Sequence, residues 1–236
     1  MNLPRLYAIL DAACFPGAGA MSAAAEELAA GGVTLLQYRN KSGNARQMLD
    51  QARELKRLVG GRVTLIMNDR ADLCLAAEFD GLHVGQDDLS PEAARRIIGE
   101  SPSAAKAASG GGPLAARVEL VPFPETIAKG ISRTRYLGVS THNPEQLALA
   151  DRTSADYLAI GPIFATSSKT NPDPVVGLAG VRRARELTRK PLVAIGGITR
   201  ANARSVIEAG ADAVAVISDL IRDPRKSAEE FLRTLG

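Results

Sequence analysis

Basic and amide side chains alternate at the end of a short apolar run near residue 37. Gln37, Arg39 and Lys41 are each separated by one residue, and an extended chain turns every second side chain toward the same face. Two fixed cations beside an amide suit a phosphate or pyrophosphate group, which accepts charge-assisted hydrogen bonds. The alternative is that this stretch is only the polar end of a strand.

Acidic clusters follow the next two apolar runs. Asn68-Asp69-Arg70 follows the first, and Gly85-Gln86-Asp87-Asp88 follows the second. Proteins hold Mg²⁺ with one or two carboxylates, completed by substrate phosphates and water. Asp69 and Asp88, at neighbouring strand ends, therefore predict a site for a hard cation, although Asp69 could instead cap the start of a helix.

Four later segments offer hydrogen-bond donors to a ligand. Ser140 directly follows an apolar run, and the hydroxyls of residues 166–168 stand beside Lys169, where they could gather phosphate oxygens. Gly196-Gly197 and Ile217-Ser218 follow the last two apolar runs. Backbone amides after the last two strands form the phosphate site of many α/β barrels.

The histidines and cysteines give weaker signals. His142 lies in a predicted loop and could carry a proton, whereas His83, inside an apolar run, is expected to be packed rather than reactive. Cys14 and Cys74 form neither a disulfide framework nor a metal-ligand spacing, and both are expected to be small buried hydrophobes. The sequence contains no convincing Ser-His-Asp set, zinc spacing or dinucleotide fingerprint.

Eight short apolar runs alternate with helical patterns along the chain. The runs are nearly continuous, as expected for parallel strands covered by helices on the outside. The predicted strands are Leu6–Leu10, Val33–Tyr38, Val63–Met67, Gly81–Val84, Tyr136–Val139, Tyr157–Ile160, Leu192–Ile195 and Ala213–Ile217. The predicted helices are 20–30, 44–59, 91–98, 144–151, 178–189, 200–209 (capped by Thr199) and 225–235.

This alternation predicts an α/β fold. A doubly wound open sheet would fit, but eight strand–helix units in one compact chain favour a single-domain (β/α)8 TIM barrel over residues 1–236. A weak internal repeat supports repeated units, because Asp80, Asp156 and Asp212 each precede an apolar run. An aspartate at this point suits a helix-to-strand turn.

Residues 100–135, between the fourth helix and the fifth strand, interrupt the pattern. The segment is too long for an ordinary connection and contains a glycine run and several prolines. From 101 to 135 it carries five basic and two acidic residues. We expect an inserted surface segment, partly disordered and with solvated cations, at the barrel face away from the chemistry. A lid or a subunit contact is the alternative.

Composition excludes several classes of function. The 236 residues are 45% hydrophobic and carry a net charge of only +3, too small an excess to indicate nucleic-acid binding. Aromatic residues make up 4% and tryptophan is absent, which disfavours base stacking. No apolar run approaches the ~20 residues that span a bilayer, and we see no signal peptide. We expect a cytoplasmic protein acting on small molecules, with no nucleic-acid or membrane partner; a homo-oligomer is compatible with the sequence.

Taken in order, these motifs resemble the thiamine-phosphate synthase (thiamine-phosphate pyrophosphorylase) family over about residues 6–99 and 136–233. The most specific matches are Gln37-Tyr38-Arg39-Asn40-Lys41, Asn68-Asp69, the run from His83 to Asp88, Gly138-Val139-Ser140, the run from Thr166 to Asp173 and Gly196-Gly197-Ile198. The family joins a hydroxymethylpyrimidine diphosphate to a thiazole phosphate carboxylate or its tautomer, and releases pyrophosphate. Asn40 stands where family members often have Glu, and Ala165 where Pro is frequent.

The resemblance implies a role for each matched position. Mg²⁺ would be the cofactor, held by Asp69 and Asp88. The pyrimidine diphosphate would be bound by Gln37, Tyr38, Arg39, Asn40, Lys41, Asn68, Ser140 and Lys169, of which Arg39, Lys41, Ser140 and Lys169 would take part in catalysis. The thiazole phosphate would be bound by Thr166, Ser167, Ser168, Gly197, Ile217 and Ser218. A thiazole tautomerase-like relative and a non-catalytic sensor of a phosphorylated metabolite remain the alternatives.

Overall fold

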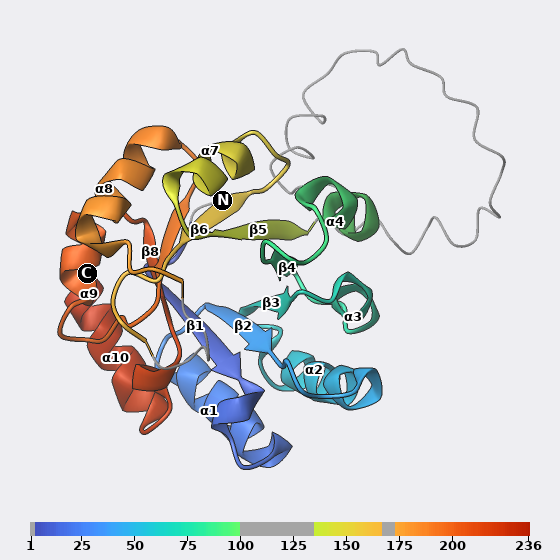
Figure 1. The fold of residues 1–236 in the computed structure, drawn as a ribbon. Coiled ribbons are helices and arrows are strands. Elements are labelled where there is room, and N and C mark those ends of the chain that lie inside the picture. Colours follow the sequence, from blue (N-terminus) through green and yellow to red (C-terminus); the bar gives the residue numbers. More distant parts are fainter. Residues whose placement is uncertain (1–2, 100–134, 167–172) are drawn as a thin grey trace, which may run out of the picture.

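The computed structural model of the chain describes residues 3–99, 135–166 and 173–236, which form a closed barrel of eight parallel strands inside a ring of helices (Figure 1). The strands follow one another in chain order, and β8 pairs with β1. The predicted (β/α)8 barrel is therefore confirmed. The strands are β1 (Leu6–Asp11), β2 (Leu35–Arg39), β3 (Thr64–Asn68), β4 (Gly81–Val84), β5 (Tyr136–Thr141), β6 (Tyr157–Ile160), β7 (Leu192–Ile195) and β8 (Ala213–Val216).

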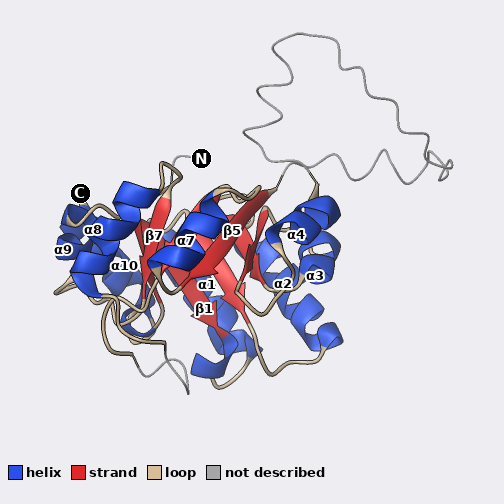
Figure 2. Ribbon diagram, turned by 45° about the horizontal axis from the view of Figure 1, so that its top comes forward, coloured by secondary structure: helices blue, strands red, loops and turns tan. Residues whose placement is uncertain are grey.

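Helices cover the outer face of the barrel (Figure 2). They are α1 (Ala18–Ala30), α2 (Ala45–Val59), α3 (Ala71–Ala76), α4 (Pro91–Ile98), α7 (Pro144–Asp151), α8 (Gly177–Leu187), α9 (Ala203–Glu208) and α10 (Pro224–Leu235). Two single turns of 3-10 helix, η1 (Ala12–Cys14) and η2 (Ser218–Leu220), follow β1 and β8.

The predicted start of one helix was wrong, and another helix had no predicted range. A helix start beside Asp69 was considered, but the six residues of α3 were not predicted. Helix α9 begins at Ala203 rather than at residue 200, and Asn202, not Thr199, is its N-cap residue. Residues 199–202 instead form a turn, in which the Asn202 side-chain oxygen accepts from the Thr199 amide at 2.8 Å.

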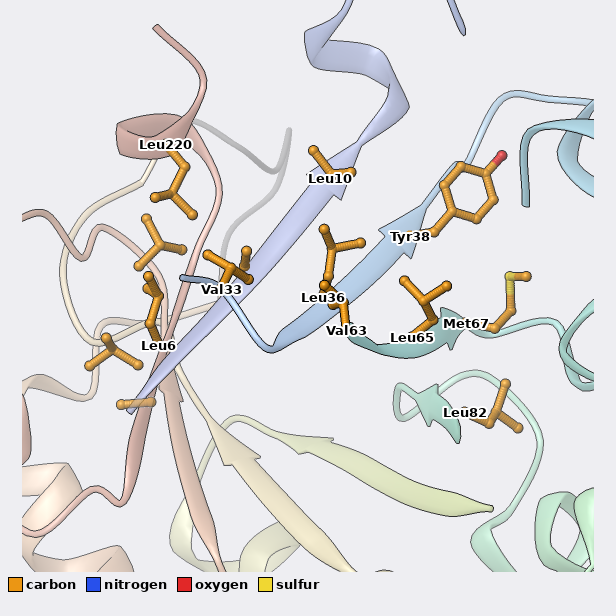
Figure 3. Packing of buried hydrophobic residues seen from close by; sticks show 14 of the residues in the cluster. Leu6, Leu10, Val33, Leu36, Tyr38, Val63, Leu65, Met67, Leu82 and Leu220 are labelled. Carbon is orange, nitrogen blue, oxygen red and sulfur yellow. The ribbon is translucent and has the colours of Figure 1, made fainter. Parts of the chain in front are cut away.

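Alternation along the strands divides the buried side chains into two layers. On β2, Leu36 and Tyr38 point outward beside Leu65 and Met67 of β3, where they pack under the helices (Figure 3). The opposite faces of the strands fill the barrel interior with a second cluster, which contains Tyr7, Ile9, Leu35, Ile66, Tyr157, Ala159, Val193, Ala213 and Ala215. Inward-pointing side chains at the carboxyl ends of the strands are therefore the ones that can reach a site at that end of the barrel.

The three repeated aspartates link pairs of strands at the opposite end of the barrel. The Asp156 amide donates to the carbonyl of Leu137 on β5 at 2.7 Å, and the Asp156 carboxylate accepts from the Leu137 amide at 2.8 Å. Asp80 and Asp212 make the same two bonds to β3 and β7. The predicted helix-to-strand turn is confirmed, and the carboxylate also holds the preceding strand in place.

Residues 100–134 lie outside the described residues, and so does the predicted inserted segment apart from Arg135. Arg135 is only 5% exposed, and its guanidinium donates to the carbonyls of Phe79 and Ile98 at 3.1 and 3.3 Å. The expectation of solvated cations is therefore wrong for Arg135, because the barrel itself supplies hydrogen-bond acceptors.

The two cysteines differ. Cys74 is buried as predicted, and burial raises the pKa of its thiol to about 12. Cys14 is exposed, which corrects the prediction, because it lies in the turn η1, where no residue is buried in the core. Among the described residues, we find no helix long and apolar enough to cross a membrane.

Candidate active site

A cavity of about 600 Å³ lies at the carboxyl ends of the strands, and every strand of the barrel contributes to its lining. Of the residues predicted to bind substrate or metal, the lining includes Gln37, Arg39, Lys41, Asn68, Asp69, Asp88, Ser140, Thr166, Gly197, Ile217 and Ser218. Tyr38 and Asn40 are not part of it. Ser167, Ser168 and Lys169 lie outside the described residues.

Strand alternation explains why Tyr38 and Asn40 lie elsewhere. Tyr38 points outward from β2, and its hydroxyl donates to Gln51 on α2 at 2.6 Å. The Asn40 side-chain oxygen accepts from the amides of Ser42 and Gly43 at 3.0 and 2.8 Å. These two residues therefore shape the loop that follows β2 rather than facing the cavity.

Both cations at the end of β2 have a carboxylate partner. Arg39 forms an ion pair with Asp11, which is 4% exposed and lies opposite Arg39 in the β1–β2 ladder. Lys41 forms an ion pair with Asp69. Asp11 was missed from sequence; the available signal was a lone carboxylate directly after the apolar run of the first strand.

Asp69 and Asp88 lie within hydrogen-bonding reach of each other. Burial raises the pKa of Asp69 above its ordinary value, and the Asp88 carboxylate adds to that rise. Asp88 is partly desolvated as well, but hydrogen bonds from Asp69 and from the Gly85 amide, at 2.8 Å, leave its pKa lowered. Two carboxylates that share a proton in this way can share a divalent cation instead.

The backbone at Asp69 also favours a functional role over a capping one. Asp69 has φ of 60°, a conformation that non-glycine residues rarely adopt and that is concentrated at functional sites. The helix α3 starts after Arg70 and has no side-chain cap, so the alternative that Asp69 caps this helix is wrong. A tight turn, in which the Arg70 amide donates to the Asn68 carbonyl at 2.7 Å, aims the Asp69 carboxylate at Asp88.

The surroundings leave room for ligand oxygens. The side-chain nitrogen of Asn68 is buried beside this turn and has no hydrogen-bond partner, so it has a donor to offer. Among the residues that the structure describes, no three His, Cys, Asp or Glu side chains gather closely enough to hold a metal ion unaided. Asp69 and Asp88 therefore fit a cation such as Mg²⁺, which keeps water or substrate oxygens as its other ligands.

On the far side of the cavity, two glycines let two loops pack closely. Gly196 and Gly197 have φ of 99° and 64°, and a Cβ on Gly197 would lie 2.5 Å from the carbonyl oxygen of Ala165. Arg200 holds the next loop in place, because its amide and guanidinium both donate to Asp219 of η2. Thr166, Gly197 and Ser218 thus meet at one wall of the cavity.

A chain of hydrogen-bonded polar side chains forms part of the floor of the cavity. The Gln37 nitrogen donates to the Tyr7 hydroxyl at 2.9 Å, and the Tyr7 and Tyr157 hydroxyls are 3.0 Å apart. His83 Nδ1 lies 3.1 Å from the Tyr157 hydroxyl, and its Nε2 lies 2.8 Å from Ser140 Oγ. His83 is buried as predicted, and burial lowers the pKa of its ring to about 4.

His142 lies at the rim of the same cavity. Its Nδ1 is 2.7 Å from the carbonyl oxygen of Gly161 and 3.4 Å from the Asp173 carboxylate. These contacts join the end of β5 to the chain on either side of residues 167–172. His142 therefore has a positional role that its sequence context did not predict.

Together, the fold and the cavity define a (β/α)8-barrel enzyme with its site at the carboxyl ends of the strands. The family model described as "Thiamine monophosphate synthase" matches residues 6–103 and 124–220. A relative from Koribacter versatilis named thiamine-phosphate synthase is 57% identical over 238 residues, covering 100% of this chain and 97% of the relative. One from Chloroflexus aurantiacus with the same name is 39% identical, covering 98% of this chain and 92% of the relative. The chain belongs to the thiamine monophosphate synthase family and is an enzyme of the transferase class.

Solved structures agree with this assignment. The thiamine phosphate pyrophosphorylase from Pyrococcus furiosus superposes with a TM-score of 0.75 at 29% identity, over 98% of this chain and 95% of that chain. A geranylgeranylglyceryl phosphate synthase from Thermoplasma acidophilum superposes with a TM-score of 0.64 at 14% identity, over 99% of this chain and 94% of that chain. The second likeness concerns the fold alone.

Proposed function

We propose that this enzyme joins hydroxymethylpyrimidine diphosphate to thiazole phosphate, or to its carboxylate with loss of carbon dioxide, and releases pyrophosphate to give thiamine phosphate. The observation that carries the proposal is the meeting of two cations, Arg39 and Lys41, with two carboxylates, Asp69 and Asp88, at neighbouring strand ends in one cavity. A diphosphate with a divalent cation needs both kinds of group within a few ångströms.

The diphosphate binds on the β2–β4 side of the cavity. Arg39, fixed by Asp11, and Lys41 supply positive charge, while the unpartnered Asn68 nitrogen donates to a phosphate oxygen. Gln37 and Ser140 hold the pyrimidine end. Lys169 is a further candidate for a diphosphate contact by its motif.

The thiazole phosphate binds at the opposite wall, where Thr166, Gly197 and Ser218 face the cavity. Positive φ at Gly197 turns the backbone sharply there, so its amide is available to a phosphate oxygen. Ile217 contributes backbone beside Ser218, and Ser167 and Ser168 belong to the same group by motif. The two substrates thus enter from different walls and meet over the barrel interior.

Asp69 and Asp88 would hold Mg²⁺, which would supply positive charge against the departing diphosphate. The bond between the pyrimidine methylene carbon and the diphosphate oxygen breaks, and its electron pair leaves with pyrophosphate. The thiazole nitrogen lone pair then forms the new C–N bond. Arg39 and Lys41 stabilise the charge that develops on the leaving group, and holding both substrates together supplies the remaining acceleration. No protein nucleophile is required.

The test separates this activity from its two alternatives. Purified enzyme is given the thiazole phosphate alone, the pyrimidine diphosphate alone, or both together with Mg²⁺, and phosphorus NMR follows each sample. A synthase releases pyrophosphate only when both are present. A tautomerase changes the thiazole phosphate on its own, and a sensor binds it unchanged; either result would refute the proposal.

A further inference from the structure

The polar chain at the floor of the cavity connects five strands of the barrel. Its members are Gln37 on β2, Tyr7 on β1, Tyr157 on β6, His83 on β4 and Ser140 on β5. The two tyrosines are separated by 150 residues, so only closure of the barrel brings them together. Tyr7, Gln37, His83 and Ser140 all contribute to the lining of the cavity, whereas Tyr157 is not part of it.

Donor and acceptor counts give this chain a single direction. A tyrosine hydroxyl carries one proton, and Tyr7 already accepts from the Gln37 nitrogen, so its own proton goes to the Tyr157 oxygen. The Tyr157 proton then goes to Nδ1 of His83. This leaves the His83 proton on Nε2, from which it is donated to Ser140 Oγ.

Burial keeps every member of the chain neutral. Tyr7 and Tyr157 are 1% and 0% exposed, and burial raises the pKa of both hydroxyls well above their ordinary value. Desolvation acts in the opposite direction on His83 and lowers its pKa. At neutral pH this hydrogen-bond chain therefore carries no net charge. It transmits only the direction of its hydrogen bonds from one end to the other.

The barrel also leaves space for this arrangement. Gly138 lies on β5 beside Tyr157 and His83, and a Cβ there would come within 2.4 Å of the Tyr157 oxygen and 2.5 Å of His83 Nδ1. Any other residue would push apart the two groups that meet at the centre of the chain. The absence of a side chain at position 138 is thus a requirement of the hydrogen-bond chain.

The direction fixes what each end presents to a ligand. One proton of the Gln37 nitrogen is engaged by Tyr7, which fixes the orientation of the amide and leaves the Gln37 oxygen to accept from the cavity. With Ser140 Oγ accepting from His83, the Ser140 proton is left to be donated into the cavity. Reversing one end requires every bond in the chain to reverse, because buried hydroxyls left unpaired are costly.

We propose that Tyr7, Tyr157 and His83 are positioning residues that form a one-way hydrogen-bond relay, which sets Gln37 as an acceptor and Ser140 as a donor toward the ligand. The relay selects a ligand whose edge offers a hydrogen-bond donor to Gln37 and an acceptor to Ser140. Identifying that ligand as the pyrimidine diphosphate rests on the proposed function, whereas the relay itself does not.

The direct test is the tautomer of His83, read from the ring nitrogen chemical shifts in enzyme without substrates. The chain has two histidines, so a His142→Asn variant assigns the signals. We expect the Nε2–H tautomer in the unaltered enzyme. In Gln37→Glu the carboxylate has no proton to donate, so Tyr7 must donate to it and the relay reverses, which converts His83 to the Nδ1–H tautomer.

The matched control is Gln51→Glu, which places the same carboxylate beside the hydroxyl of Tyr38, outside the cavity. It should leave His83 in the Nε2–H form. An Nδ1–H tautomer in the unaltered enzyme would overturn the relay, and so would a tautomer that does not change in Gln37→Glu. In a network with only a structural role, the substitution at Gln37 would not change the tautomer of His83.

A kinetic test links the relay to the substrate. Tyr7→Phe frees the Gln37 amide to rotate, and we expect KM for the pyrimidine diphosphate to rise about tenfold with KM for the thiazole phosphate unchanged. Tyr136→Phe, at the other end of the barrel interior, is the control. Equal changes in both KM values would overturn the positioning role; if Tyr7→Phe fails to fold, Tyr157→Phe takes its place. If the unaltered enzyme turns over neither substrate, the proposed function fails while the tautomer measurement still decides the relay.

Discussion

Asp11 and Arg39 lie opposite each other at the ends of β1 and β2, and the buried Asp11 carboxylate holds the Arg39 guanidinium in an ion pair at the edge of the cavity. The pair gives the site a cation with a fixed position. Because Asp11 also accepts from the Ala13 amide at 3.1 Å, its own position is set by the turn η1. A diphosphate that binds Arg39 therefore meets a group that is already oriented.

The Asp11→Asn substitution should weaken use of the pyrimidine diphosphate. It removes the charge that orients Arg39 and preserves the side-chain shape, so kcat/KM for that substrate should fall roughly 10- to 100-fold, as expected for loss of one charge-assisted contact. Steady-state kinetics with each substrate varied in turn measures the effect. The control is Asp72→Asn, which breaks the exposed pair with Arg70 and should change little. A loss confined to the thiazole phosphate would reverse the assignment of the two walls.

Asp88→Ala should abolish most turnover and leave binding of the thiazole phosphate nearly intact. The variant removes one of two carboxylates available to a cation, whereas the thiazole phosphate wall contains neither. Calorimetry of thiazole phosphate binding, beside a rate measurement at saturating Mg²⁺, separates the two effects. Chelation of divalent cations should mimic the variant, and Asp50→Ala on the surface of α2 serves as the control. Full activity of Asp88→Ala at saturating Mg²⁺ would refute the metal site.

His83 should make stability depend on pH in the acid range. The folded protein holds a neutral ring with a pKa of about 4, against 6.5 for an ordinary histidine. The unfolded chain thus takes up a proton between those values and the folded one does not. The free energy of unfolding should therefore fall as pH drops through this window, by about 3 kcal/mol in total from His83.

Urea unfolding at several pH values tests this linkage. The difference in unfolding free energy between the unaltered protein and His83→Gln should shrink as the pH falls from 6.5 toward 4. His142→Asn retains His83 and should keep the slope of the unaltered protein. A difference that is independent of pH would show that the folded state does not exclude the proton.

Asp156→Ala should destabilise the fold far more than Asp212→Ala, although each variant removes the same carboxylate bond to a neighbouring strand and keeps the backbone bond. The Asp156 side chain is 7% exposed and pairs with Arg95, whereas that of Asp212 is 48% exposed. Removing one partner of a buried pair costs about 3–5 kcal/mol, while a surface pair contributes up to about 1 kcal/mol. Equal losses in chemical denaturation would contradict the burial argument.

The barrel could be predicted because its strands are continuous apolar runs bounded by turn residues, which few other arrangements accommodate. The range of helix α3 could not be predicted because the helix has six residues and no side-chain cap, and follows a backbone turn that only the tertiary structure imposes. Arg135 was misjudged because its acceptors are the carbonyls of Phe79 and Ile98, which composition cannot reveal.

The candidate site, like the fold, could be predicted from the sequence only in part. Alternation along β2 correctly grouped Gln37, Arg39 and Lys41 on the face that reaches the cavity, and placed Tyr38 on the other. Motif resemblance had included Tyr38 with the binding residues because motifs carry no direction. The relay escaped the sequence entirely, since His83 and Tyr157 each look like ordinary packed residues until the closed barrel joins them.

The most direct test of the proposed activity is the stoichiometry of its products. Enzyme is supplied with hydroxymethylpyrimidine diphosphate, thiazole phosphate and Mg²⁺, and both pyrophosphate and the coupled product are quantified over time by phosphorus NMR and mass spectrometry. We predict that thiamine phosphate and pyrophosphate appear in equal amounts, and that omitting either substrate stops both. Pyrophosphate released without thiamine phosphate, or no pyrophosphate from the folded protein, would contradict the proposed coupling.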